Sequence, residues 1–139
     1  MKYAYLDSSI WIACAEGIPV YRDIVQIELK SLGDNGWQLC FSDLVILEVL
    51  LKPYRMNRND IIIRYNKVFS EAIRFTAFDT VFIDALLCAQ RDNLKAIDAT
   101  HIAFAVKYGC ELFVTTDPDF RTLQSLPLHF IDLSQIAIK

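Results

Sequence analysis

The sequence predicts an α/β fold in which a parallel β-sheet lies between two layers of helices. Short apolar segments of strand length alternate with longer segments whose apolar residues recur at helical spacing. This alternation is typical of parallel sheets, whose strands are joined by helical crossovers. Because such crossovers are right-handed, every strand ends at the same edge of the sheet. The carboxylates of Asp7 and Asp117, which follow two of these strands, should therefore share that edge.

The chain begins with a predicted strand and helix. Residues 2–6 form the strand, which stops at Asp7-Ser8-Ser9. Pro19 suits the first turn of a helix, where its missing N–H leaves nothing unpaired. The turn at residues 34–36 ends this helix. Its apolar positions are Val20, Ile24, Ile27 and Leu32.

A second strand and helix follow. Residues 37–41 form the strand, and Ser42 is a favoured N-cap for a helix over residues 43–51. Pro53 is expected to terminate that helix, because proline lacks the N–H that a helix interior needs. Residues 52–59 then form a basic, hinge-like loop.

Two helices with a weaker strand between them come next. Residues 60–72 keep a helical period in Ile61, Tyr65, Val68 and Ala72. Residues 73–77 are the weaker strand. Asp79 or Thr80 is expected to cap a helix whose apolar positions are Val81, Ala85, Leu86 and Ala89.

The last third of the chain has the clearest pattern. A helix runs from Asp98, with an apolar face of Ile97, Ile102, Ala105 and Val106, and Gly109 ends it in a left-handed conformation. Residues 112–114 form a buried strand that stops at Thr115-Thr116-Asp117-Pro118. A short helix with Phe120 and Leu123 and a strand at residues 128–133 complete the chain.

Length and composition indicate one domain, residues 1–139. A hydrophobic fraction of 54% and a mean hydropathy of +0.29 suggest that a partner covers part of the surface, so we expect an oligomer or a complex. The net charge of −3 gives no general attraction to nucleic acid. Such contact would need a local patch, and Lys52, Arg55 and Arg58 beside Tyr54 could supply one, although a solvated loop is the equal alternative.

The cysteines indicate a reducing, cytoplasmic location. The chain has four cysteines, none of them in a CxxC pair, and two histidines, which makes a zinc site improbable. Asp7 interrupts the apolar N-terminus too early for a signal peptide, and no apolar run reaches the ~20 residues of a membrane span. We therefore expect no membrane association.

Each candidate acid has a structural alternative. Glu48 interrupts an apolar helix face, yet it could pair with Lys52. Asp98 could be only an N-cap. Asp7, Asp117 and Asp119 could be turn or cap residues.

Considered jointly, the acids predict a metal site. Asp7, Asp98 and Asp117 lie at segment ends that the topology brings together, and carboxylates about 5 Å apart would repel by roughly 3 kcal/mol per pair. Such a cluster needs a cation. An all-oxygen ligand set suits Mg²⁺ or Mn²⁺. These ions polarise phosphodiesters, so the expected chemistry is phosphodiester hydrolysis.

Several polar residues near the acids are candidates for supporting roles. His101, one turn after Asp98, either contacts substrate or packs in the core. The hydroxyl residues next to the strand-end acids could orient carboxylates, or they could only form turns. These residues are Ser8, Ser9, Thr115 and Thr116.

These segments resemble the PIN-domain nucleases, and among them the VapC-type toxins of prokaryotic toxin–antitoxin pairs. The opening strand of that family is similar to Tyr5-Leu6-Asp7-Ser8-Ser9, and its helical glutamate to Glu48 in SDLVILEVL. The family's helix that begins with an aspartate resembles residues 95–103, KAIDATHIA. Its closing Thr-x-Asp-x-x-Phe resembles residues 115–120. The resemblance runs nearly end to end.

The resemblance implies a three-layer α/β/α sandwich with a mainly parallel five-stranded sheet, and a Mg²⁺- or Mn²⁺-dependent endoribonuclease. By this carry-over Asp7, Glu48, Asp98 and Asp117 are catalytic metal ligands, and Asp119 assists them. It also implies an RNA substrate, a homodimer and, for a toxin, an antitoxin partner. Pro118 and Thr100 depart from the usual family residues, but neither replaces a ligand.

Other classes fit less well. A phosphate-accepting receiver domain needs a pair of acids after its first strand, and a haloacid-type phosphatase needs Asp-x-Asp, where this chain has Ser8 and Ser9. A PIN nuclease of RNA processing that is not a toxin remains an alternative. A non-catalytic PIN-like module that binds RNA or protein is another, although all four expected ligands are present.

Overall fold

Five parallel strands form one sheet at the centre of the molecule, in the order β3-β2-β1-β4-β5. The computed structural model describes residues 1–134. The predicted parallel α/β fold with five strands is confirmed. The strands are β1 (Lys2–Leu6), β2 (Trp37–Ser42), β3 (Ile73–Phe75), β4 (Leu112–Thr115) and β5 (Leu128–Phe130).

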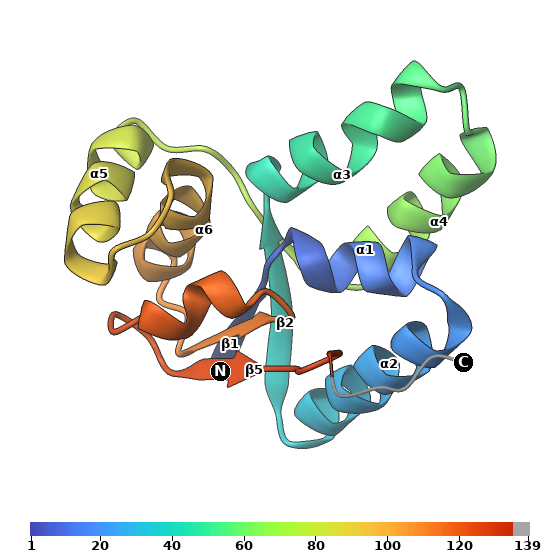
Figure 1. Cartoon of the computed structure of the whole chain (residues 1–139), viewed down its shortest axis with the longest axis horizontal. Helices are drawn as coiled ribbons and strands as arrows, with labels where there is room; N and C mark the ends of the chain where they lie inside the picture. Colours follow the sequence, from blue (N-terminus) through green and yellow to red (C-terminus); the bar gives the residue numbers. More distant parts are fainter. Residues whose placement is uncertain (135–139) are drawn as a thin grey trace.

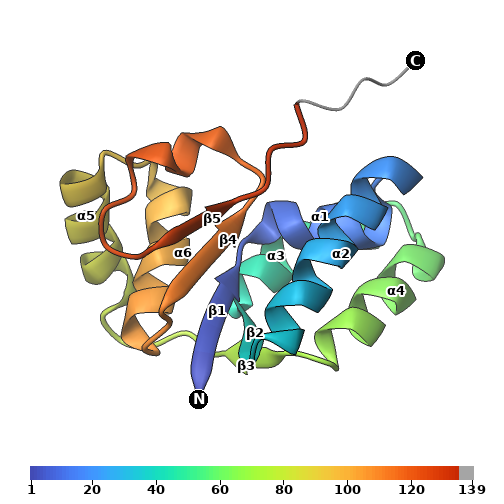
Figure 2. The same cartoon turned by 90° about the horizontal axis from the view of Figure 1, so that it is seen from below.

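Helices cover both faces of this sheet. Helices α5 and α6 pack on one face, and α1 to α4 lie on the other, which makes three layers (Figures 1 and 2). The helices are α1 (Ser8–Glu16), α2 (Pro19–Asp34), α3 (Asp43–Arg55), α4 (Asn59–Phe69), α5 (Val81–Asp92), α6 (Ala96–Lys107) and the short 3₁₀ helix η1 (Pro118–Thr122).

The order of the strands reverses between β1 and β4. The chain builds outward from β1 to β2 and β3, then returns to place β4 on the other side of β1 and β5 beyond it. Leu6 and Val114 are partners in the β1–β4 register, and the N–H of Asp7 donates to the carbonyl of Val114 over 3.2 Å. In open α/β sheets ligands bind beyond the carboxyl ends of the strands at such a reversal. Asp7 and the residues that follow β4 therefore lie where a ligand site is expected.

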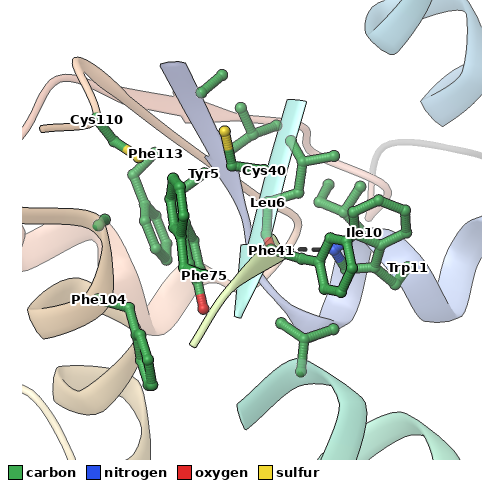
Figure 3. Close-up of a cluster of buried hydrophobic side chains, with 14 of the residues drawn as sticks. Tyr5, Leu6, Ile10, Trp11, Cys40, Phe41, Phe75, Phe104, Cys110 and Phe113 are labelled. Atoms are coloured by element: carbon green, nitrogen blue, oxygen red, sulfur yellow. Dashed lines mark hydrogen bonds between the residues drawn. The ribbon is translucent and has the colours of Figure 1, made fainter. Parts of the chain in front are cut away.

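The core lies on both faces of the sheet because successive strand residues point to opposite sides. On one face the ring of Tyr5 stacks on Phe113, with centroids 5.5 Å apart. On the other face Trp11 packs edge to face against Phe41 and donates its indole N–H to the carbonyl of Leu6 over 3.1 Å (Figure 3). These contacts pack β1 against β4 on one face of the sheet and tie α1 to β1 and β2 on the other.

The helix over residues 43–51 is longer than predicted. Pro53 lies inside α3, which continues to Arg55, so Pro53 does not terminate it and the basic loop is shorter than expected. The proline sits near the end of the helix, where it removes a single interior hydrogen bond, and its ring is buried. Burial of the ring offsets that loss.

Three of the predicted apolar faces are only partly buried. Ile27 of α2 is 69% exposed, Leu86 of α5 is 65% exposed, and Ile97 and Val106 of α6 are also exposed. Helix α6 instead buries every residue from Ala99 to Ala105. It packs against the sheet on one side and against α5 on the other, so a single apolar stripe does not describe it.

The remaining structural expectations have mixed outcomes. The last strand, β5, is shorter than residues 128–133, and the predicted domain extends into residues 135–139, which lie outside the described part of the chain. The four cysteines form no disulfide. Among residues 1–134, no helix combines the length and the apolar character that crossing a bilayer requires.

Candidate active site

The candidate site lies at the carboxyl ends of β1 and β4, where the strand order reverses. Asp7 directly follows β1, Thr115 is the last residue of β4, and Asp117 comes two residues later. Asp98 lies in the first turn of α6, which begins at Ala96, so it is not the N-cap of that helix. The alternative interpretation of Asp98, that it only caps the helix, is therefore wrong.

Asp7 is held in a buried hydroxyl cradle. The residue is 4% exposed. Ser9 donates to Oδ1 and Thr115 donates to Oδ2, each over 2.6 Å. Burial raises the pKa of Asp7 to about 6, although the charge of His101 and the two hydroxyl hydrogen bonds favour the ionised form. A cation would be needed to favour the ionised carboxylate further.

Three other acids form a compact cluster. One carboxylate oxygen each from Asp98, Asp117 and Asp119 lie within 4.8 Å of one another. Burial and then the charge of Asp117 raise the pKa of Asp98. Lys95, the N-cap residue of α6, places its ammonium 3.3 Å from Oδ2 of Asp119. The structure therefore concentrates negative charge here and offsets it with one exposed lysine.

The chemistry of this cluster fits a hard divalent cation. Its ligand atoms are carboxylate oxygens, which Mg²⁺ and Mn²⁺ prefer to thiolate or imidazole. Oδ1 of Asp117 accepts the backbone N–H of Asp119 over 2.9 Å, which sets the two carboxylates relative to each other. Asp117, rather than Asp119, therefore caps η1.

Glu48 lies on α3 beside the Asp7 cradle. Its Oε1 accepts from the hydroxyl of Ser8 over 2.7 Å and lies 2.6 Å from Nε2 of His101. Burial would raise the pKa of Glu48, but the hydrogen bond and charge of His101 and the bond from Ser8 lower it below its ordinary value. Glu48 makes these contacts instead of the alternative salt bridge with Lys52.

The hydroxyl residues connect the acids to one another. The oxygen of Thr115 accepts the N–H of Asp117 over 2.9 Å while its hydrogen goes to Asp7. The oxygen of Ser9 likewise accepts the N–H of Thr116 over 3.0 Å. The three-acid cluster does not include Asp7 or Glu48 in the described part of the chain, but Thr115 links Asp7 to it directly.

The basic residues of the predicted patch lie apart from this network. Lys52 and Arg55 lie in the last turns of α3, away from Ser42 at its start. Arg58 follows α3 and pairs with Asp60 at 3.0 Å. Their contact with RNA stays a prediction.

Sequence reasoning missed three residues of the site. Tyr5 and Ser42 were assigned to a strand and to a helix cap, but their hydroxyls lie 2.7 Å apart, and that of Tyr5 is 2.7 Å from Nδ1 of His101. In the sequence, Lys95 stands out only as the first residue of the segment 95–103 that resembles the PIN-domain family. A polar atom on an otherwise apolar strand is the signal that could have singled out Tyr5.

Comparisons with known proteins agree with this fold. A family model described as PIN domain matches residues 4–126. The comparison with curated proteins gives no match.

Solved structures of low sequence identity share the fold. VapBC2 from Rickettsia felis, bound to a DNA fragment from its promoter, aligns with a TM-score of 0.77 at 13% identity over 94% of this chain and 99% of the other. A toxin–antitoxin complex from Klebsiella pneumoniae has a TM-score of 0.68 at 20% identity over 88% and 94%. VapC20 from Mycobacterium tuberculosis, described as a sarcin–ricin loop cleaving toxin, has a TM-score of 0.63 at 18% identity over 84% and 92%.

Proposed function

Because this chain belongs to the PIN domain family, we propose that it is a Mg²⁺- or Mn²⁺-dependent endoribonuclease. The observation that carries the proposal is the cluster of Asp98, Asp117 and Asp119 at the reversal between β1 and β4. Three ionised carboxylates held this close together repel one another, and a bound cation would offset that repulsion. A site that binds a hard cation beyond the strand ends is suited to phosphate chemistry.

Asp98, Asp117 and Asp119 would hold the cation, with Asp7 and Glu48 as the nearby acids that complete its surroundings. When bound, Mg²⁺ or Mn²⁺ supplies positive charge that polarises a phosphodiester and stabilises the charge that develops on it. We propose Asp7, Glu48, Asp98 and Asp117 as the catalytic acids.

The surrounding side chains orient these acids and influence their ionisation. Ser9 and Thr115 hold the two oxygens of Asp7 in one orientation. The contacts of Glu48 with Ser8 and His101 keep it ionised at neutral pH, since they lower its pKa. Ionised carboxylates that are already oriented need little rearrangement to bind a cation or to accept a proton.

We further propose that the RNase is the toxin of a toxin–antitoxin pair. Two of the structures that share this fold are toxin–antitoxin complexes, and a third is a toxin that cleaves the sarcin–ricin loop. Exposed apolar side chains on α5, among them Phe82 at 76% and Leu86 at 65%, provide surface for an antitoxin or for a second copy in a homodimer. The RNA would reach the site in the cytoplasm, with Lys52, Arg55 and Arg58 contacting its phosphates.

RNA cleavage by purified protein tests the proposal. Structured RNA is incubated with Mn²⁺ or Mg²⁺ and wild type, Asp98→Asn or Asp117→Asn, with EDTA as a control. Asp23→Asn is the matched variant, because Asp23 is an exposed acid of α2. We expect wild type and Asp23→Asn to cleave, and the two site variants and the EDTA sample to be inactive.

Equal cleavage by all variants would contradict the proposed site. Growth on expression tests the toxin role separately: wild type should slow growth more than Asp98→Asn does. Cleavage of RNA without an effect on growth would favour a PIN nuclease of RNA processing. Tight binding of RNA without cleavage would favour the non-catalytic module.

A further inference from the structure

A chain of buried hydrogen bonds leads from the sheet to Glu48. Ser42 at the end of β2 contacts the hydroxyl of Tyr5 on β1 at 2.7 Å, and this hydroxyl lies 2.7 Å from Nδ1 of His101 on α6. Nε2 of His101 then lies 2.6 Å from Oε1 of Glu48 on α3. Side chains from β1, β2, α3 and α6 thus form one chain, in which the imidazole ring joins Tyr5 to Glu48.

The chemistry of the carboxylate sets the direction of the hydrogen bond to Glu48. An ionised carboxylate only accepts hydrogen bonds, so Nε2 of His101 carries the hydrogen that Glu48 receives. Nδ1 of His101 shares a hydrogen bond with the hydroxyl of Tyr5, and that hydroxyl shares another with Ser42. Both nitrogens of the buried ring therefore have a partner, and Nε2 is the donor to Glu48.

Packing holds the ring where these bonds place it. His101 is 3% exposed, and Tyr5 is fully buried. The ring of Tyr5 stacks on Phe113 and meets the ring of His101 edge to face, with centroids 5.7 Å apart. The imidazole is thus a rigid donor rather than a mobile one.

Glu48 needs such a donor, because its own surroundings do not fix it. Its side chain is 34% exposed, and its helix neighbours Leu47 and Leu51 are exposed as well. His101 and Ser8 both bind Oε1. Within the described part of the chain, their contacts leave Oε2 for other ligands. The hydrogen bonds therefore select one orientation of an otherwise free carboxylate.

We propose that His101 is a positioning residue: held by Tyr5, it orients Glu48 so that the carboxylate presents Oε2 to the cation site. The inference rests on the proposed function for its consequence in catalysis, but the orientation of Glu48 can be measured without any activity. In this role His101 affects metal binding only by orienting Glu48, and it needs no contact of its own with RNA.

Two amides that mimic opposite halves of the imidazole test the proposal. The Nδ2/Oδ1 group of His101→Asn occupies the Nδ1 side, so it keeps a partner for Tyr5 but is too short to reach Glu48. The longer His101→Gln places an N–H near the position of Nε2. The matched control is His129→Asn, since His129 contacts Glu28 at 3.2 Å between β5 and α2, outside the site.

Two measurements provide the readouts. Crystal structures of the metal-free variants show the orientation of Glu48, and titrations that follow the signal of free Mn²⁺ give the affinity for the ion. We expect His101→Asn to release Glu48 from its orientation and to weaken Mn²⁺ binding by about 10- to 100-fold, while His101→Gln stays within about threefold of wild type. His129→Asn should match wild type. In a Glu48→Gln background, His101→Asn should have no further effect.

The other outcomes overturn the proposal. These are an unchanged Glu48 in His101→Asn, equal losses in the Asn and Gln variants, or a loss that persists in the Glu48→Gln background. Wild type that takes up no Mn²⁺ would overturn it together with the metal site of the proposed function. The expected Mn²⁺ pattern in a protein that cleaves no RNA would instead support the positioning role and contradict the endoribonuclease.

Discussion

Thr115, the last residue of β4, donates its hydroxyl hydrogen to Oδ2 of Asp7 at the end of β1, over 2.6 Å. Its oxygen accepts the backbone N–H of Asp117 over 2.9 Å. One fully buried hydroxyl therefore ties the acid of the first strand to the loop that carries the three-acid cluster.

Thr115→Val should destabilise the protein. Valine keeps the branched shape, but it removes the hydrogen bonds of the hydroxyl to Oδ2 of the buried Asp7 and to the backbone N–H of Asp117. Hydrogen bonds to charged groups contribute about 1.5–3 kcal/mol, so we expect a loss of that order in the free energy of unfolding by urea. Thr116→Val is the matched control on the next residue. An equal loss in both variants would contradict a specific role for the Thr115 hydroxyl.

The contribution of Asp7 to the stability of the metal-free protein should fall as the pH rises between about pH 4 and pH 6. Because burial raises the pKa of Asp7 from 3.8 to about 6, the folded state holds a proton in this range that the unfolded state has released. The stabilising effect of protonation is complete below the unfolded pKa and is lost as the pH rises through the folded pKa. The full effect corresponds to about 3 kcal/mol.

Urea unfolding of wild type and Asp7→Asn in EDTA checks this pH dependence. Asparagine can keep contacts with both hydroxyls, because Ser9 and Thr115 can accept as well as donate. We expect Asp7→Asn to be the more stable protein at about pH 7.5 and the difference to narrow towards about pH 4. A difference that is constant with pH would show that Asp7 does not titrate in this range.

Mn²⁺ or Mg²⁺ should raise the melting temperature of wild type. A ligand that binds only the folded state stabilises it by about 2.7 kcal/mol at about 100 times its Kd. Asp117→Asn should lose most of this shift, because it removes one charge from the three-acid cluster, whereas Asp23→Asn should keep it. Calorimetry at constant ionic strength is the measurement. Equal shifts in all three proteins would indicate general screening rather than a site.

Two glycine substitutions should act in opposite directions. Gly109 has a φ of +77°, so Gly109→Ala should cost about 1–2 kcal/mol of unfolding free energy. Gly33 lies in α2, where an added Cβ meets nothing within 4 Å, so Gly33→Ala should stabilise by about 0.5–1 kcal/mol. Urea unfolding of both variants checks the signs. A stabilised Gly109→Ala would contradict the left-handed end of α6.

Much of the fold could be predicted because it depends on local patterns. Each strand was located from a short apolar run, and every longer helix except α1 from its spacing or its ends. Helix α1 was not predicted. Parallel connections then placed Asp7 and Asp117 at one edge. The start of α6 was misjudged, since the helix already begins at Ala96, two residues before the aspartate that looked like a cap, although Ala96 and Ile97 are both exposed. The end of α3 was misjudged in the same way at Pro53.

The partners of the acids could not be predicted. Glu48 was compared with its neighbours on the same helix, but it binds Ser8 and His101, which are 40 and 53 residues away. Both interpretations of His101 were incomplete, because the residue is buried and yet contacts a candidate catalytic acid. A periodic pattern carries no information about which distant side chains face one another.

The sequence by itself determined the α/β class, the parallel sheet and the edge at which Asp7 and Asp117 meet, because these follow from hydrophobic spacing and from the handedness of crossovers. Only the tertiary structure decided that Asp98, Asp117 and Asp119 form the compact cluster and that Tyr5 and His101 lie behind Glu48. The reason is physical: hydrogen bonds and the distances between carboxylates depend on side-chain packing between elements, which local spacing does not encode.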